Sequence, residues 1–401
     1  MSNLTAAPPW VHSHYRVTGT LLFVPALFVL SALYVTVPLI PVFAEEFHIS
    51  LEQAAWSGSA FSLFFALGCL VYGPLSNRLG RKRVIVLGLA ALSLATLGTG
   101  LISSFKALIA FRCIQGAAAA TFSPVALTYA GEVFPPHKRI SAIGMISAGF
   151  LMAGILGQVW ASYLQERLGW HAVFTLLSAV YGLTFLALAL FLPSSPAVRK
   201  NASVPGSRRA EWRNVLANRH LWLCYGVAVM LLLCFVGMYT ALGSILQGRP
   251  YELSNMEMLG IRSFGMIGML CCFVSGPLCA RWGSLTVLRG GLLLSIASLF
   301  LMSLVRSIYS YSALSVVFVA GIAVLVPSLI SLVGDIGGKQ RAVATSLYTF
   351  ILFVGASLGP IVSVRVLSIG QPDALPFLAF AGLLAVGLIH SLFIKHPPRT
   401  P

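Results

Sequence analysis

The feature that most constrains this chain is a series of twelve apolar stretches, each long enough to cross a bilayer. A spanning helix needs about 20 mainly apolar residues. Because lipid offers the backbone no hydrogen bonds, each such stretch is expected to be a helix. The sequence therefore predicts an all-α membrane protein with twelve transmembrane helices, at about 17–40, 53–76, 84–104, 106–131, 140–164, 171–193, 219–247, 257–280, 284–305, 309–334, 342–367 and 374–394.

The composition agrees with this prediction and argues against other classes of protein. Charged residues make up 9% of the 401 residues and hydrophobic residues 58%, whereas soluble domains contain about 25% charged residues. The basic residues behind the net charge of +16 lie mostly between the apolar stretches, as topology signals do, so we expect no nucleic-acid partner. The seven cysteines lie in apolar stretches without metal-ligand spacing, and no nucleophile–base pair or phosphate loop stands out. We expect no metal, no cofactor and no enzymatic activity.

The chain divides into two sets of six predicted helices. Residues 194–218 are rich in Pro, Ser and basic residues, which predicts a cytoplasmic linker between an N-terminal bundle (1–193) and a C-terminal bundle (219–401). With the N-terminus inside, the inside segments hold 19 Lys and Arg residues and the outside loops hold four. Since cytoplasmic loops carry the excess of basic residues, both termini are predicted to be cytoplasmic.

An internal repeat relates the two halves. The stretch "GPLSNRLGRKR" at 73–83 and the stretch "GPLCARWG" at 276–283 share Gly-Pro-Leu, Arg and Gly at an offset of 203 residues. The same offset relates Glu132 to Asp335. Six spans in each half give both halves the same orientation, so we expect pseudo-symmetry about the membrane normal and a substrate site between the halves near the midplane.

These motifs resemble those of the major facilitator superfamily. "GPLSNRLGRKR" resembles the family's loop motif between spans 2 and 3, and "FRCIQG" at 111–116 resembles its span 4 motif. "GFLMAGILGQ" at 149–158 is similar to the span 5 motif of the drug and metabolite:proton antiporters, and "SLYTFILFVGASLGP" at 346–360 resembles small bacterial efflux permeases of that branch. The resemblance implies the major facilitator fold in a bacterial cytoplasmic (inner) membrane. Asn77 departs from the family's usual Asp.

The loop motif and its copy supply candidate gating residues. Gly73 and Gly80 allow helix ends to approach closely, and Arg78 and Arg81 can donate to carbonyls at helix ends. We expect such contacts to form in one rocked state and break in the other, with Gly73 and Arg78 foremost; the alternative is that the cations only set orientation. The candidate set is Gly73, Asn77, Arg78, Gly80, Arg81, Gly276 and Arg281.

Candidate substrate or coupling residues lie inside the predicted spans. Arg112 lies about seven residues into span 4, where insertion of an arginine costs about 2.5 kcal/mol or more, so it should face the bundle interior or water. It either contacts the substrate or coupling ion, or donates structurally to backbone carbonyls. Arg262, near the start of span 8, either serves the cavity, or snorkels or pairs with Glu257. The candidate set is Ser31, Tyr34, Arg112, Gln115, Tyr239, Arg262 and Tyr348.

Two further patterns bear on function. None of the ten carboxylates lies in the middle of a predicted span, so a cavity with arginines and hydroxyls should prefer neutral or anionic solutes. Small residues at spacings of three and four in spans 5 and 11 predict close helix packing. The packing set is Gly149, Gly154, Gly157, Gly355, Gly359 and Pro360.

The function expected from these patterns is secondary active transport by alternating access. The leading hypothesis is a monomer that exports a small neutral or anionic drug or metabolite in exchange for protons. One alternative is an importer or exchanger of an organic anion. An alternative from another class is a membrane receptor or scaffold that does not transport.

Overall fold

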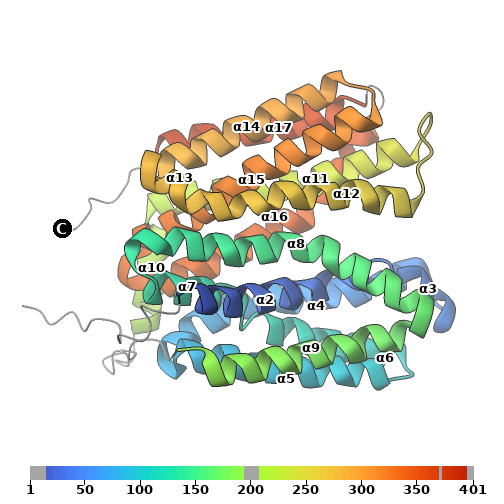
Figure 1. Cartoon of the computed structure of the whole chain (residues 1–401), viewed down its shortest axis with the longest axis horizontal. Helices are drawn as coiled ribbons and strands as arrows, with labels where there is room; N and C mark the ends of the chain where they lie inside the picture. The colour runs from blue at the N-terminus through green and yellow to red at the C-terminus, as the bar shows by residue number, and fades with distance from the viewer. Residues whose placement is uncertain (1–14, 194–206, 370–372, 395–401) are drawn as a thin grey trace, which may run out of the picture. The chain divides into compact units, whose positions relative to one another are not determined.

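The computed structural model describes residues 15–193, 207–369 and 373–394, and all regular elements in these ranges are helical (Figure 1). Their labels begin at α2. The chain forms two compact units, Met1–Arg208 and Arg209–Pro401. This boundary falls inside the segment 194–218. Residues 194–206 lie outside the described residues, and 207–217 form a helix, α10. That the segment is a cytoplasmic linker remains a prediction.

Unit 1 contains the six predicted N-terminal spans, and two of them are interrupted. The first predicted span stops at Tyr34, and a turn containing Pro38 precedes a short helix. The fourth is broken at 120–122, just before Pro124. Proline disfavours helical geometry in the residue before it and removes a backbone donor, which accounts for breaks at these positions. The elements are α2 (Tyr15–Tyr34), α3 (Ile40–Glu46), α4 (Leu51–Leu79), α5 (Arg81–Leu101), α6 (Phe105–Ala119), α7 (Ser123–Val133), α8 (Pro136–Leu168) and α9 (Trp170–Phe191).

Unit 2 repeats the pattern with its own irregularities. The eighth predicted span of the chain, which is the second of this unit, is α-helical at both ends and has a 3₁₀ segment in the middle. The elements are α10 (Ser207–Ala217), α11 (Arg219–Gln247), α12 (Asn255–Met269), η1 (Leu270–Val274), α13 (Ser275–Trp282), α14 (Ser284–Leu304), α15 (Ile308–Gly337), η2 (Gly338–Gln340), α16 (Arg341–Leu367) and α17 (Leu375–Leu392).

The number of spans agrees with the sequence once one long stretch is divided. Within the described residues, 11 stretches are long and apolar enough to cross a membrane, and one of them runs for 60 residues, from Ile308 to Leu367. A single helix of 60 residues would be about 90 Å long, about three times the thickness of the hydrocarbon core of a bilayer. This stretch contains two helices, α15 and α16, joined by η2. Counting them separately gives twelve spans.

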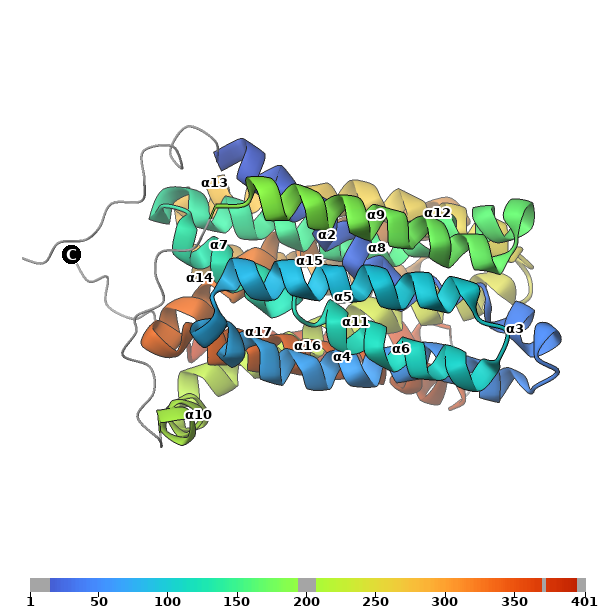
Figure 2. The ribbon, with the colours of Figure 1, turned by 90° about the horizontal axis from the view of Figure 1, so that it is seen from below.

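The internal repeat is visible in the packing of each unit. In unit 1, α2 packs on α8, α4 on α6, and α5 on α9. In unit 2 the corresponding pairs are α11 with α16, α12 with α15, and α14 with α17. Figure 2 shows α5 and α9 running lengthwise through unit 1. Each half of the sequence therefore builds the same helix-packing scheme.

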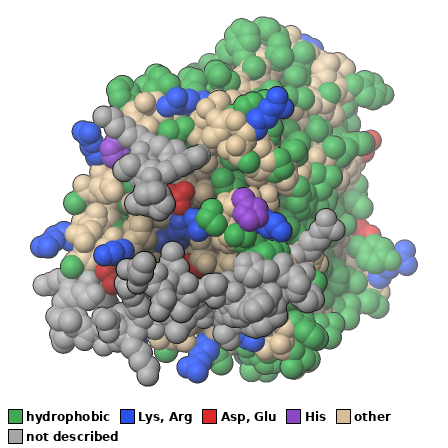
Figure 3. Space-filling view, turned by 60° about the vertical axis from the view of Figure 1, so that its left-hand side comes forward, with side chains coloured by type: hydrophobic (Ala, Val, Ile, Leu, Met, Phe, Trp, Pro, Cys, Tyr) green, Lys and Arg blue, Asp and Glu red, His purple; other side chains and the backbone are tan. Residues whose placement is uncertain are grey.

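The helix flanks are apolar on the outside as well as inside. Leu87, Leu94 and Leu101 lie seven residues apart on α5 and are 66%, 70% and 71% exposed. Ile85 and Leu89 on the same helix are buried. Figure 3 shows hydrophobic side chains over the flanks and basic side chains at the end brought forward. A helix that is apolar on both faces suits contact with lipid on one side and protein on the other.

Candidate functional site

The α4–α5 connection consists of one glycine. Gly80 has φ +91° and ψ 140°, and it is the C-cap of α4 and the N-cap of α5. An L-residue is strained at this φ. Its copy, Gly283, has φ +82° between α13 and α14. The repeated glycine therefore allows a one-residue reversal and brings the first turn of α5 back beside the last turn of α4.

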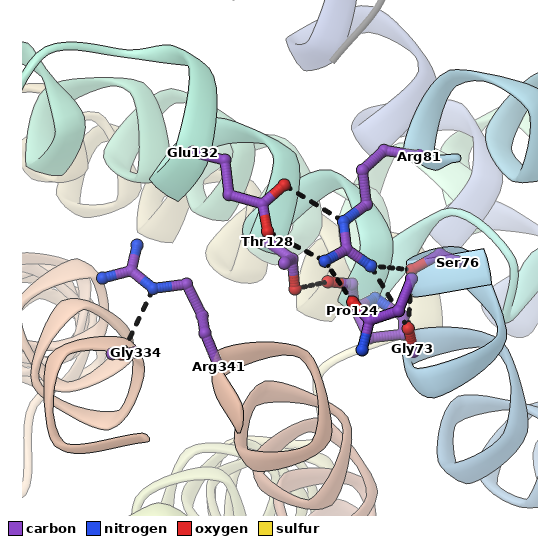
Figure 4. Close-up of polar contacts among 9 residues, drawn as sticks. Gly73, Ser76, Arg81, Pro124, Thr128, Glu132, Gly334 and Arg341 are labelled. Carbon is purple, nitrogen blue, oxygen red and sulfur yellow. Dashed lines mark hydrogen bonds and ion pairs between the residues drawn. The ribbon is translucent and has the colours of Figure 1, made fainter. Parts of the chain in front are cut away.

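Arg81 is the centre of the contacts at this reversal. Its Nε and Nη2 donate to Glu132 Oε2 and Oε1 of α7 over 3.1 and 2.8 Å. Nη2 also donates to Asn77 Oδ1 over 2.5 Å, and Nη1 donates to Ser76 Oγ and, over 3.4 Å, to the Gly73 carbonyl. Figure 4 shows Arg81 reaching across to α4 on one side and to Glu132 on the other. The arginine thus ties the α4–α5 turn to the end of α7.

The other predicted gating residues divide between the interior and the surface. Gly73 and Gly276 are buried, whereas Arg78 and Arg281 are exposed. The Arg281 guanidinium lies 5.7 Å from the centre of the Trp282 ring. Asn77 accepts from Arg81, so the residue that replaces the family's aspartate still contributes to the cluster without adding a charge. The hub is Arg81 rather than Arg78.

In unit 2 the carboxylate that corresponds to Glu132 has a different arginine partner. Position 284, which corresponds to Arg81 at an offset of 203, is a serine. Asp335, which corresponds to Glu132, pairs instead with Arg341 at the start of α16, with Nη2 2.6 Å from Oδ1. Arg341 Nε also donates to the Gly334 carbonyl over 3.2 Å. Each unit therefore holds a helix-end carboxylate with an arginine, but the arginine comes from a different helix in each.

A buried polar network surrounds Arg112 in the middle of unit 1. Arg112 is fully buried on α6. Its Nε donates to the Ser57 carbonyl of α4 and its Nη2 to the Ala32 carbonyl of α2, both over 2.8 Å. Its Nη1 donates to Gln115 Oε1 over 2.7 Å. The guanidinium carbon lies 4.4 Å from the centre of the Phe61 ring. In this structure the arginine joins three helices through backbone carbonyls and one side chain.

Gln115 extends this network to a fourth helix. Its Nε2 donates to Thr99 Oγ1 of α5 over 2.8 Å. Thr99 in turn donates to the Ala95 carbonyl over 2.9 Å. Arg112 and Gln115 are therefore hydrogen-bonded to each other on one face of α6, and the network links α2, α4, α5 and α6 within one unit. A contact with substrate remains a prediction for both residues.

The candidate residues of α2 lie against the face of α8 that is formed by small residues. Ser31 Oγ donates to the Leu27 carbonyl over 2.8 Å and to the Ala153 carbonyl over 3.2 Å. A Cβ on Gly157 would lie 2.7 Å from the Ser31 carbonyl, and one on Gly149 would lie 2.9 Å from the Ala26 Cβ. A Cβ on Gly154 would meet the Tyr34 ring at 3.5 Å. The glycines allow α2 and α8 to approach closely.

Unit 2 uses the same arrangement between α11 and α16. A Cβ on Gly359 would lie 2.7 Å from the Leu233 carbonyl, and one on Gly355 would meet the Val229 carbonyl. Pro360 follows within α16. Tyr348, also on α16, is fully buried and its hydroxyl makes no hydrogen bond.

Arg262 lies in a different position from Arg112. It is half-buried on α12, and its Nη2 is 3.5 Å from the Tyr239 carbonyl of α11. Glu257 does not pair with it, because that carboxylate accepts from the Ser254 backbone and hydroxyl in a capping box. Tyr239 is buried between these helices.

Sequence reasoning missed the partners of these arginines. Ser76, Glu132, Phe61 and Thr99 were not among the predicted site residues, although the first three contact an arginine and Thr99 accepts from Gln115. For Glu132 a signal existed: the predicted topology puts it and Arg81 at the same membrane face. For Phe61 and Thr99 no sequence signal distinguishes them from other core residues.

The comparisons with known proteins agree with this architecture. An uncharacterized MFS-type transporter of Bacillus subtilis (strain 168), YybF, is 27% identical over 333 residues, covering 81% of this chain and 80% of that protein. Multidrug resistance protein 3 of the same organism is 26% identical over 306 residues, covering 72% of this chain and 54% of that protein. The crystal structure of the human organic anion transporter MFSD10 (TETRAN) covers 96% of this chain and 100% of its own, with a TM-score of 0.76 and 20% identity, which shows a shared fold.

A protein-family model matches most of the chain. The model described as Major Facilitator Superfamily matches residues 22–360, from α2 into α16. This range includes the Arg81 cluster, the Arg112 network and the α11–α12 contacts. The chain therefore belongs to the major facilitator superfamily, as a multi-pass membrane transporter of a small solute and not an enzyme.

Proposed function

We propose that this transporter exports a small neutral or anionic drug or metabolite in exchange for protons, as a monomer in a bacterial cytoplasmic membrane with both termini in the cytoplasm. The observation that carries the proposal is the environment of Arg112. Its guanidinium is fully buried, and its hydrogen-bond partners are two backbone carbonyls and the Gln115 side chain. No carboxylate is among them.

A buried cation without a carboxylate partner favours some solutes over others. The three acceptors of Arg112 carry no net charge, so its positive field extends into the low-dielectric interior. This field opposes a cationic solute and attracts an anionic one. Arg262 is a second cation: it lies seven residues after the first residue of α12, as Arg112 lies seven residues after the first residue of α6, about 10 Å along each helix.

The relatives support the direction and the class of solute. Multidrug resistance protein 3 is named for drug resistance, which export produces. The span 5 and span 11 motifs that resemble the proton antiporters correspond to α8 and α16, whose glycines lie in close contact with α2 and α11. Close contacts without interlocking side chains suit helices that slide during alternating access.

We also propose that the Arg81 cluster stabilises the α4–α5 turn during this cycle. Arg81, Asn77 and Glu132 lie within one unit, so they hold the shape of that unit's helix ends. Gly73, six residues before the end of α4, and Gly276, in the first turn of α13, are buried, and the lack of a side chain permits close helix approach. The contacts that open and close would then form on a surface that Arg81 keeps rigid.

A flux assay tests the proposed function. Inverted membrane vesicles that contain the protein receive neutral, anionic and cationic organic solutes, with a proton gradient and after its collapse by a protonophore. We expect gradient-dependent uptake of neutral or anionic compounds and none of cationic ones. Vesicles without the protein are the control. Gradient-dependent uptake restricted to cations would contradict the proposal, and anion exchange without a gradient would favour the alternative of an organic-anion importer or exchanger.

A further inference from the structure

Where α11 packs against α12, polar side-chain atoms lack hydrogen-bond partners within the described part of the protein. Arg262 makes a single long contact from Nη2 to the Tyr239 carbonyl, at 3.5 Å, and its buried Nε has no hydrogen-bond partner. Arg112, in contrast, places all three of its nitrogens on acceptors at 2.7–2.8 Å. An unsatisfied N–H of a charged group in a buried position carries a desolvation penalty. Of these two arginines, Arg262 is the one whose buried Nε lacks a hydrogen-bond acceptor.

Tyr239 adds a hydroxyl where the same two helices pack. It is 8% exposed, and its hydroxyl makes no hydrogen bond of standard geometry; the Ser315 hydroxyl of α15 lies beside it as a possible acceptor. Ser315 donates its own proton to the Ser312 carbonyl over 2.8 Å. The Tyr239 ring packs edge-on against Phe235 with ring centres 5.6 Å apart, which restricts its orientation. The hydroxyl is thus a fixed, buried donor.

Two glycines make room for these groups. A Cβ on Gly265, three residues after Arg262 on α12, would collide with the Tyr239 hydroxyl. A Cβ on Gly243, four residues after Tyr239 on α11, would lie 3.3 Å from Arg262 Nη2. The glycines lie on the facing sides of the two helices, because spacings of three and four residues share a helix face. Any larger residue would displace the hydroxyl or crowd the guanidinium.

We propose that Arg262 and Tyr239 form a binding site for the carboxylate of an organic anion. The inference rests on the proposed function, whose solute it narrows to carboxylates. The planar fork of an arginine matches the two oxygens of a carboxylate, and a phenol adds a third donor. The pseudo-symmetric position in unit 1 cannot supply this chemistry, since Ser59 replaces Arg262 and Thr36 replaces Tyr239 at an offset of 203. The carboxylate site thus belongs to unit 2.

Equilibrium binding to the purified full chain in detergent tests the site without depending on transport. The probes are benzoate and its uncharged amide analogue, benzamide. We expect benzoate to bind more tightly than benzamide. Arg262→Gln should weaken benzoate binding about tenfold or more and leave benzamide binding unchanged, because a charge-assisted hydrogen bond is lost. Tyr239→Phe should weaken benzoate binding about threefold, since one neutral donor is lost.

Matched variants control for effects on folding. Arg365→Gln removes an exposed arginine in the last turn of α16 and should leave benzoate affinity unchanged. Gly265→Ala should weaken benzoate binding by displacing the hydroxyl, whereas Gly260→Ala on the same helix should not, because a Cβ there meets nothing within 4 Å. Arg262→Lys keeps the charge and should retain part of the preference for benzoate.

The outcomes separate this site from the proposed function. Equal affinity of the wild type for benzoate and benzamide, or benzoate binding by Arg262→Gln as tight as in the wild type, would overturn the site. A site that passes these tests stands even if vesicle flux shows no proton coupling, in which case the proposed function alone fails. Proton-coupled export of carboxylates that is insensitive to Arg262→Gln would support the proposed function and refute the carboxylate site.

Discussion

Replacing Arg81 tests whether the α4–α5 cluster stabilises the protein, and it separates Arg81 from its exposed neighbour Arg78. Arg81→Gln removes the guanidinium and leaves Glu132 without that cation. A glutamine is too short to reach Glu132, Asn77 and the Gly73 carbonyl together. We therefore expect a loss of the five hydrogen bonds that Arg81 makes in this cluster.

The magnitude follows from the exposure of the two partners. The Arg81 side chain is 6% exposed and the Glu132 side chain 33%. Removing one partner of a fully buried ion pair costs about 3–5 kcal/mol. Because water reaches about a third of Glu132 and can hydrate its carboxylate after Arg81 is removed, the cost should fall to about 2 kcal/mol. In a double-mutant cycle with Glu132→Gln, the coupling should be about 1–2 kcal/mol.

The assay is the free energy of unfolding of the purified protein in detergent micelles, measured by denaturant titration. Arg78→Gln is the matched control, since Arg78 lies three residues away and is exposed. We expect the control to change the free energy by less than about 0.5 kcal/mol. The reasoning is refuted if Arg81→Gln and Arg78→Gln are equally stable, or if the effects of Arg81→Gln and Glu132→Gln simply add.

Three further predictions concern packing, the buried network and topology. Gly157→Ala should destabilise the protein by about 1–3 kcal/mol in the same titration, because its Cβ would press on the α2 backbone. Gly382→Ala, where a Cβ meets nothing within 4 Å, should be neutral or stabilising, and equal effects would count against the packing argument. Arg112→Lys should lower both the thermal stability and the transport rate, since one ammonium cannot replace donors directed at three acceptors; wild-type values for both would show that the network is dispensable. An impermeant thiol reagent added outside should label a cysteine introduced at position 249 and fail to label one at position 208, and the reverse pattern would invert the proposed topology.

The sequence by itself determined the fold class, the number of spans and the repeat. These follow from local properties, because a span is recognised by about 20 consecutive apolar residues whatever surrounds it. Gly80 and Gly283 occupy matching places in the repeated motif, but the structure was needed to show their positive φ and the reversals there. The breaks before Pro38 and Pro124 were also readable, but hydropathy alone merged them into continuous spans.

Only the tertiary structure decided which charged residues serve which role. Position along a helix gives the depth of a side chain, but its partners come from distant parts of the chain. Arg81 meets Glu132 51 residues away, and Arg112 meets the Ala32 carbonyl 80 residues away. Arg78 and Arg81 look alike in the motif, yet Arg78 is exposed, whereas Arg81 follows the reversal at Gly80 and is buried against Ser76 and Glu132. Likewise Arg112 and Arg262 occupy similar positions along their own helices, yet helix packing gives the first three hydrogen-bond acceptors and leaves the Nε of the second without one.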